Sequence, residues 1–177
     1  MCIRDRVAEE DPNAVVSFHY YLPMLLSHYK MLAWVGYQGA VQYPGVVIPT
    51  QSDADKYPQY ASFHKTTYNA DRIMGEMSNA ASDGRNAGLA VHCGEFGCSK
   101  NVAEAMRLAW FTDMVAAMEA NNIPWTLWEC LDGGFGFVDM EYGIYRINCP
   151  LLKVLTGKEL TDAEAKVLLQ KYGFKTE

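Results

Sequence analysis

The heptapeptide VHCGEFG at residues 91–97 is an apolar run that ends at an acidic residue held between two glycines. Apolar residues before a glycine are typical of a buried strand, and a carboxylate just past the end of such a strand lies at the rim of the sheet. The carboxyl ends of strands are where α/β proteins place their reactive groups. Glu95 is therefore the first candidate for a functional side chain.

Two other runs have the composition of strands. Residues 14–21 are β-branched and aromatic, and they follow a turn signal at residues 11–13. Residues 124–128 combine proline, tryptophan and threonine before a glycine-rich turn. Together with a strand expected at residues 89–93, they give the chain three candidate strands.

The segment between the second and third strands has the clearest helical pattern. Apolar side chains recur every three or four residues around Trp110, which is typical of a helix packed on a sheet. Asn101 with Glu104 resembles a capping box and predicts the start of this helix, and Asn121 suits its end. A weaker pattern predicts another helix over residues 67–81.

The order of these elements predicts the fold class. A second capping box at Thr161 and Glu164 predicts a terminal helix after the third strand. Strands that alternate with helices imply a parallel sheet with right-handed crossovers, which is an α/β fold. Between Gly36 and Lys65 the pattern dissolves into prolines, glycines and acidic residues, and we expect a structureless loop over an active site there.

Composition and charge exclude several classes of function. At 177 residues and 50% hydrophobic, the chain has material for one sizeable core. A net charge of −6 argues against nucleic-acid and anionic-membrane partners, because either would call for a basic face. No run approaches the roughly 18 apolar residues that span a bilayer. The five cysteines contain no CxxC pair and predict no zinc site, and we expect neither a metal nor another cofactor.

Side-chain alternation predicts which of the polar residues meet. Successive side chains of a strand point to opposite faces, so His19 and Tyr21 share one face. By the same rule Glu95 is expected on the face of Cys93, with His92 on the opposite face. Three adjacent parallel strands would bring a carboxylate, a phenol, an imidazole and an indole together at their carboxyl ends, which suits a sugar site.

Several short motifs follow one another along the chain. They are DPNAVVSFHYYLP at 11–23, AW at 33–34, YPG at 43–45, GEFG at 94–97, WTLWE at 125–129 and GGFG at 133–136. In this order they resemble glycoside hydrolase family 5, the cellulase family, over roughly residues 11–155. The resemblance implies the C-terminal part of a (β/α)8 TIM barrel, about three βα units that correspond to its strands 6 to 8.

The resemblance also implies roles for individual residues. Glu95 matches the nucleophile of a retaining mechanism, and Tyr21 matches the tyrosine that hydrogen-bonds the nucleophile. His19 matches the active-site histidine near the acid/base, and Trp128 matches the aromatic platform under the sugar whose bond is cleaved. The implied substrate is a β-linked oligo- or polysaccharide, and the implied location is secreted or periplasmic.

Two further residues are candidates for substrate binding. Trp34 and His28 follow the first strand, where a substrate cleft is expected. Exposed aromatic side chains are also common in loops without a ligand, so a purely structural role stays open for both.

One part of the family pattern is absent from this sequence. The family supplies its acid/base as the glutamate of an Asn-Glu pair on strand 4, and the 177 residues contain no such dipeptide. A whole barrel needs roughly 250 residues. We therefore expect residues 11–177 to be part of a catalytic domain, residues 1–10 to be a non-native or linker segment, and the chain alone to be inactive.

Two other classes of function stay open. A non-catalytic carbohydrate-binding descendant of the same fold would keep Trp128 and the cleft aromatics without an acid/base. A different parallel α/β enzyme, such as a doubly wound hydrolase or dehydrogenase, would carry GxSxG or GxGxxG after a strand. The chain has neither motif.

Overall fold

A central parallel sheet organises the computed structural model, which describes residues 11, 13–31, 36–131 and 133–177. Its strands are β1 (Val15–Tyr20), β4 (Ala90–Phe96) and β5 (Trp125–Leu127), in the order β1-β4-β5. Both pairings are parallel, so the three predicted strands and their common direction are confirmed. The strand β4 is longer than predicted, and Glu95 lies inside it rather than just past its end.

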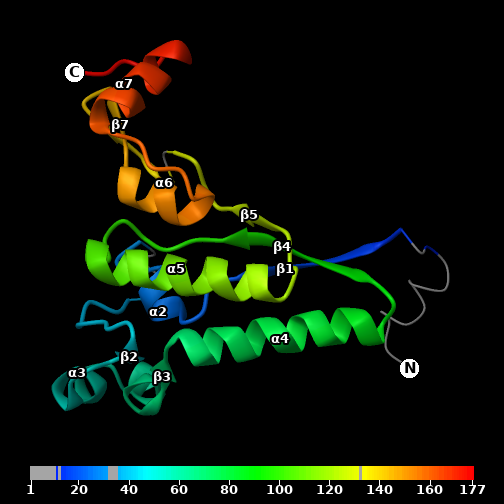
Figure 1. Cartoon of the computed structure of the whole chain (residues 1–177). Coiled ribbons are helices and arrows are strands. Elements are labelled where there is room, and N and C mark those ends of the chain that lie inside the picture. The colour runs from blue at the N-terminus through cyan, green and yellow to red at the C-terminus, as the bar shows by residue number, and fades with distance from the viewer. Residues whose placement is uncertain (1–10, 12, 32–35, 132) are drawn as a thin grey trace.

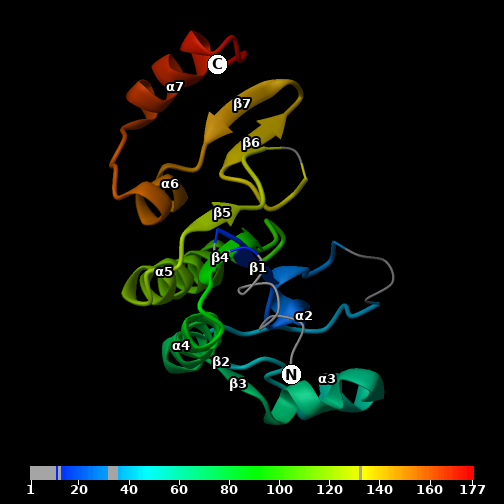
Figure 2. The same cartoon turned by 90° about the vertical axis from the view of Figure 1, so that its right-hand side faces the viewer.

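Two long helices, α4 (Ala70–Asn86) and α5 (Glu104–Ala120), lie side by side against one face of the sheet (Figures 1 and 2). Trp110 and Phe111 of α5 are fully buried, and their rings lie 6.3 and 5.8 Å from the ring of Phe96 on β4. The core therefore fills the layer between the sheet and these helices.

The predicted capping box of α5 is wrong. The N-cap of this helix is Ala103, which makes no side-chain cap. The side chain of Asn101 donates instead to the main-chain oxygen of Tyr29, 3.2 Å away. The Asn101 amide thus bonds a residue distant in the sequence instead of capping the helix, and a local sequence pattern does not reveal such a competing partner.

The segment expected as a structureless loop is folded. Its elements are β2 (Gly45–Val46), α3 (Gln51–Lys56) and the 3-10 helix η1 (Pro58–Lys65), and β2 pairs with β3 (Thr67–Tyr68). Val47 and Ile48 are fully buried, and the Tyr43 hydroxyl donates to Asp113 of α5 at 2.5 Å. The expectation of a loop is wrong because each element is too short to show a periodicity.

After β5 the chain forms a hairpin and two helices that lie beyond the sheet in Figure 1. They are β6 (Val138–Glu141), β7 (Ile144–Ile147), α6 (Cys149–Thr156) and α7 (Asp162–Lys171). The capping box of Thr161 and Glu164 is confirmed at the start of α7. A short helix, α2 (Met24–Ser27), follows β1. Within the described ranges, no helix has the length and apolar character needed to cross a membrane.

Candidate active site

The candidate residues gather on the face of the sheet that turns away from α4 and α5. On β1, Tyr20 is buried and stacks on Trp110 at 6.4 Å between ring centroids. The preceding residue, His19, has a side chain that is 56% exposed. Alternation therefore places His19 and Tyr21 on the open face, as expected.

A β-bulge in β4 turns Glu95 onto this same open face. Phe18 pairs with Cys93 but His19 pairs with Glu95, so Gly94 is an extra residue in the strand. The expectation that Glu95 shares the face of Cys93 is wrong, because the extra residue reverses the alternation after it. Cys93 is fully buried on the helix side, whereas the Glu95 side chain keeps 29% of its surface exposed.

The bulge explains the glycine at position 94 and the place of His92. A Cβ on Gly94 would lie 2.5 Å from Oγ of Ser17, which is closer than van der Waals contact allows. The expectation for His92 is also wrong, because its partner Ser17 belongs to the open face that receives Glu95. The His92 ring lies there with Nε2 3.2 Å from Oγ1 of Thr126.

Glu95 is held by two neighbours through one oxygen atom. The Tyr21 hydroxyl donates a hydrogen bond to Oε2 of Glu95 at 2.9 Å, and Nδ1 of His19 lies 3.3 Å from the same oxygen. Burial first, and then the hydrogen bond to Glu95, raise the pKa of Tyr21 well above its ordinary value. The phenol therefore keeps its proton at neutral pH and acts as a fixed donor to the carboxylate.

The Tyr21 ring packs against two other aromatic rings. The centroid of His28 lies 4.9 Å from that of Tyr21, and the centroid of Phe135 lies 5.9 Å from it. His28 and Phe135 also meet edge to face at 5.2 Å. The structure thus places His28 beside Tyr21, half-buried, and burial lowers its pKa.

Trp128 directly follows β5, the strand next to the one that carries Glu95. Its main-chain N–H donates to the oxygen of Phe96 at 2.9 Å, and the residue is 47% exposed. An exposed indole at the carboxyl end of a strand beside β4 suits the platform that the sequence predicts. The other aromatic candidate, Trp34, lies outside the described residues.

The sequence predicted no role for Phe135 or Arg107. The ring of Phe135 contacts that of Tyr21, and Arg107 donates to the main-chain oxygen of Phe135. Arg107 is 4% exposed and donates to three main-chain oxygens, while Phe135 is 6% exposed and contacts the Tyr21 ring. The only signal for Arg107 was a charged residue within the apolar pattern of α5. Such a pattern does not reveal which distant carbonyl groups the guanidinium reaches.

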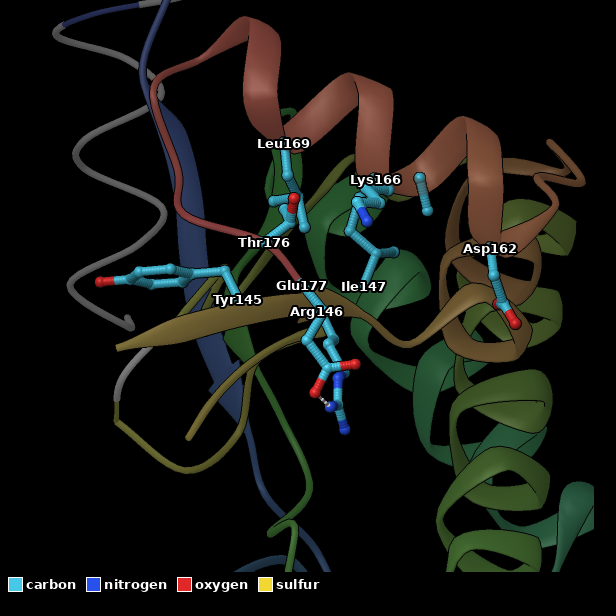
Figure 3. A pocket seen from close by; sticks show the side chains of 9 residues that line it. Tyr145, Arg146, Ile147, Asp162, Lys166, Leu169, Thr176 and Glu177 are labelled. Atoms are coloured by element: carbon cyan, nitrogen blue, oxygen red, sulfur yellow. Dashed lines mark hydrogen bonds and ion pairs between the residues drawn. The ribbon is translucent and has the colours of Figure 1, made fainter. Parts of the chain in front are cut away.

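A cavity of about 400 Å³ lies elsewhere, between β7 and α7 (Figure 3). Its lining includes Tyr145, Asp162, Lys166 and the ion pair between Arg146 and Glu177. No residue of β1, β4 or β5 lines it. The cavity is therefore separate from the cluster around Glu95.

Comparison with known proteins identifies relatives among the cellulases. The chain matches the family model for cellulase (glycosyl hydrolase family 5) over residues 4–134. It is similar to Endoglucanase C of Acetivibrio thermocellus and to Endoglucanase C307 of Clostridium sp. (strain F1), with 22% identity over 143 residues in each case. Each match covers 77% of this chain and 39% of the relative, so the chain spans about two fifths of the length of these relatives.

Solved structures share the fold of this chain. It aligns with the endoglucanase Cel5A of Thermotoga maritima at a TM-score of 0.56 and 20% identity, covering 83% of this chain and 40% of that one. It aligns with the cellulose synthase subunit Z of Clostridioides difficile at a TM-score of 0.57 and 22% identity, covering 80% and 40%. Since the family model matches well over half of its residues, this α/β chain belongs to glycosyl hydrolase family 5, the cellulase family, whose fold is the TIM barrel.

Proposed function

We propose that this chain is part of a retaining glycoside hydrolase that cleaves a β-linked polysaccharide, with Glu95 as the nucleophile. One observation carries the proposal: Tyr21 and His19 approach Oε2 of Glu95 at 2.9 and 3.3 Å, at the carboxyl ends of two paired parallel strands. A partly exposed carboxylate with a fixed orientation suits attack on an anomeric carbon. Membership of a glycosidase family supports the same chemistry.

The proposed reaction has two displacement steps. First, an oxygen of Glu95 attacks the anomeric carbon, the bond to the leaving oxygen breaks, and a second carboxylic acid gives that oxygen its proton. The sugar is then held as an ester of Glu95. Next, the second group, now a carboxylate, takes a proton from water, and the water oxygen displaces Glu95 from the anomeric carbon. Two inversions give net retention of configuration.

Three neighbours would assist Glu95 in these steps. Tyr21 would hold one carboxylate oxygen by its hydrogen bond, which leaves the carboxyl plane oriented for attack. His19, exposed beside the same carboxylate, would face the region where the second carboxyl group acts. The exposed indole of Trp128 would stack on the apolar face of the sugar ring.

We propose that the second carboxylate comes from outside these 177 residues. Retaining enzymes place their two carboxyl groups about 5–5.5 Å apart. After β5, Asp139 is ion-paired with Lys100 at 2.9 Å. Oε1 of Glu129 is buried over Gly133 and has no hydrogen-bond partner among the described residues, so it does not face solvent. In this proposal residues 11–177 supply strands 6 to 8 of the barrel as part of the catalytic domain.

The proposed substrate is a neutral β-linked glucan or mannan. Structures of the Thermotoga maritima Cel5A are known in complex with cellobiose and with mannotriose, and this chain shares their fold. The net charge of −6 also favours a neutral sugar chain over an anionic one.

The substitution Glu95→Gln in the full-length enzyme tests the proposal. It removes the nucleophile but keeps the size of the side chain, so kcat on a soluble β-glucan should fall by roughly 10³-fold or more. Glu119→Gln, an exposed position on α5, is the matched control and should leave kcat unchanged. Near-normal turnover of Glu95→Gln would remove Glu95 from the nucleophile role.

A chemical rescue separates the nucleophile from the acid/base. In Glu95→Gly, azide fits the vacated space and attacks the anomeric carbon of an aryl β-cellobioside, while the aryl oxide leaves without acid assistance. The expected product is the α-glycosyl azide, formed by a single inversion. A β-glycosyl azide would instead assign Glu95 to the acid/base role.

The same assays address the carbohydrate-binding alternative. A full-length protein that binds β-glucan through Trp128 but releases no product, with or without Glu95, would be a non-catalytic descendant. Loss of binding in Trp128→Ala, without hydrolysis in the wild type, is the outcome that would favour it.

A further inference from the structure

Arg107 is a buried cation whose hydrogen bonds go to main-chain oxygens, and its guanidinium also lies over the Phe111 ring, 5.3 Å from the centroid. It lies on α5 with 4% of its surface exposed, and among the described residues no carboxylate lies within ion-pair distance of it. Its Nε donates to the oxygen of Cys98 at 2.8 Å, and its Nη2 donates to Phe135 and Gly136 at 2.5 and 2.8 Å. A buried charge is costly unless such bonds satisfy it, so the three oxygens and Arg107 stabilise one another.

These oxygens belong to the two loops that follow the strands of the site. Cys98 comes two residues after the end of β4, and Phe135 and Gly136 lie in the turn after β5. The loops are packed tightly together, because a Cβ on Gly97 would lie 3.0 Å from the Phe135 ring. The guanidinium of Arg107 therefore fixes the distance between the ends of two strands. These are β4, which carries Glu95, and β5, which ends just before Trp128.

The ring of Phe135 transmits this constraint to the tyrosine. It meets the Tyr21 ring edge to face at 5.9 Å and the His28 ring at 5.2 Å, and it is itself 6% exposed. Edge-to-face contacts at these distances are directional as well as attractive. A displacement of the Phe135 backbone would therefore move the wall against which the Tyr21 ring rests.

We infer that Arg107 is a positioning residue, which sets the hydrogen bond from Tyr21 to Glu95 by holding the backbone of Phe135. The inference rests on the proposed function, since the positioned carboxylate is the proposed nucleophile. Arg107 touches no reacting atom, and it acts through Phe135 and Tyr21 in turn.

A double-mutant cycle in the full-length enzyme tests this chain of contacts. Arg107→Met and Tyr21→Phe should each lower kcat roughly 10- to 100-fold, with KM changed less than about threefold. If Arg107 acts through Tyr21, the double variant should be within about threefold of the slower single variant. Multiplicative losses in the double variant would overturn the inference.

Matched variants separate positioning from general damage. Arg146→Met removes an arginine whose ion pair with Glu177 is remote in the fold, and it should leave kcat unchanged. Phe135→Leu keeps the main-chain oxygens for Arg107 but removes the ring, and it should show the same non-additivity with Tyr21→Phe. If Arg107→Met does not fold, Arg107→Lys and Phe135→Leu complete the cycle on folded protein, and additivity there also overturns the inference.

A structural readout keeps the inference independent of activity. In a crystal structure of the full-length Arg107→Met variant, the Tyr21 hydroxyl should lie beyond hydrogen-bond distance from Glu95, compared with 2.9 Å here. An unchanged contact would overturn the inference. A wild-type protein that hydrolyses no β-linked glucan or mannan would refute the proposed function, and the Tyr21 contact in the variant would still decide the role of Arg107.

Discussion

The two histidines near Tyr21, His19 and His28, differ in how far each imidazole ring is buried. His19 is exposed beside Glu95, whereas His28 is half-buried and its pKa is lowered by burial. The Ser27 hydroxyl donates to the main-chain oxygen of Tyr21 at 2.5 Å and lies 2.9 Å from Nδ1 of His28. Because the Ser27 hydroxyl proton goes to Tyr21, an N–H at Nδ1 of His28 would donate to the Ser27 oxygen, and burial of the ring disfavours its second proton. The contact of His28 with substrate stays a prediction.

We predict that His28 makes the protein less stable in weak acid. The unfolded chain protonates a histidine near pH 6.5, but the folded protein does so only at lower pH, because burial lowers the pKa of His28. Below about pH 6.5 the unfolded state therefore binds more protons, and the free energy of unfolding decreases as the pH falls towards the folded-state pKa.

Urea unfolding between about pH 8 and about pH 5 measures this effect. The variant His28→Gln should lose less stability than the wild type over that range, while the pH dependence of the two should coincide above about pH 7.5. Equal losses of stability in acid would show that the pKa of His28 is the same in the folded and the unfolded protein.

The ends of β4 and β5 approach each other so closely that the elements constrain one another. Gly97 follows β4, and a Cβ on it would collide with the main-chain oxygen of Trp128. The hydrogen bond from Trp128 to the oxygen of Phe96, at 2.9 Å, continues the pairing of the strands to this point. Position 97 therefore requires glycine, because an added Cβ would meet a main-chain oxygen, which cannot move aside as the end of a flexible side chain could.

We predict that Gly97→Ala forces the ends of β4 and β5 apart. The substitution should destabilise the protein by about 1–3 kcal/mol, the usual cost of overpacking, and should lower kcat by displacing Trp128. Gly75→Ala is the matched control, since Gly75 lies within α4 with no atom of a neighbouring group within 4 Å of its added Cβ. That control should be neutral or stabilise by up to about 1 kcal/mol. Chemical denaturation of both variants compares them, and equal effects would contradict the prediction.

Elements were predictable from the sequence where a local pattern decides them. The capping box at Thr161 is local, and it is present in the structure. The amide of Asn101 has a non-local partner in Tyr29, and residues 36–65 form elements held by contacts with distant helices, so both expectations failed. The prediction of the face on which Glu95 lies was wrong for a related reason. A bulge depends on how two strands pair, and the sequence of one strand does not reveal it.

At the scale of the whole molecule, the sheet is open on one face and along two edges. Within the part of the chain that the structure describes, β1 and β5 each pair with β4 alone, and the open face exposes Val15, His19 and Trp128. That Glu95, Tyr21 and His19 lie together was predictable, because they stand at the carboxyl ends of neighbouring parallel strands, and their catalytic roles stay predictions. The contacts of Arg107 were not predictable, because its three main-chain partners lie in two loops that are distant in the sequence.

We predict that the isolated 177-residue chain does not hydrolyse β-glucan. It spans about two fifths of its relatives and lacks a second carboxylate placed for acid catalysis in our proposal. The assay is reducing-sugar release from soluble β-glucan, with the full-length enzyme as the positive control. Supplying the rest of the catalytic domain in the same cell should restore activity, and hydrolysis by the purified chain alone would refute the proposed origin of the acid/base.

The extra residue at position 94 also matters to anyone who transplants this strand into another scaffold. Grafted onto a regularly pleated neighbour, the same sequence would direct its carboxylate to the face of Cys93, which is fully buried here and where an ion is poorly tolerated. A designer must therefore copy the irregularity together with the acid, and must choose a partner strand with a small side chain at the place of Ser17.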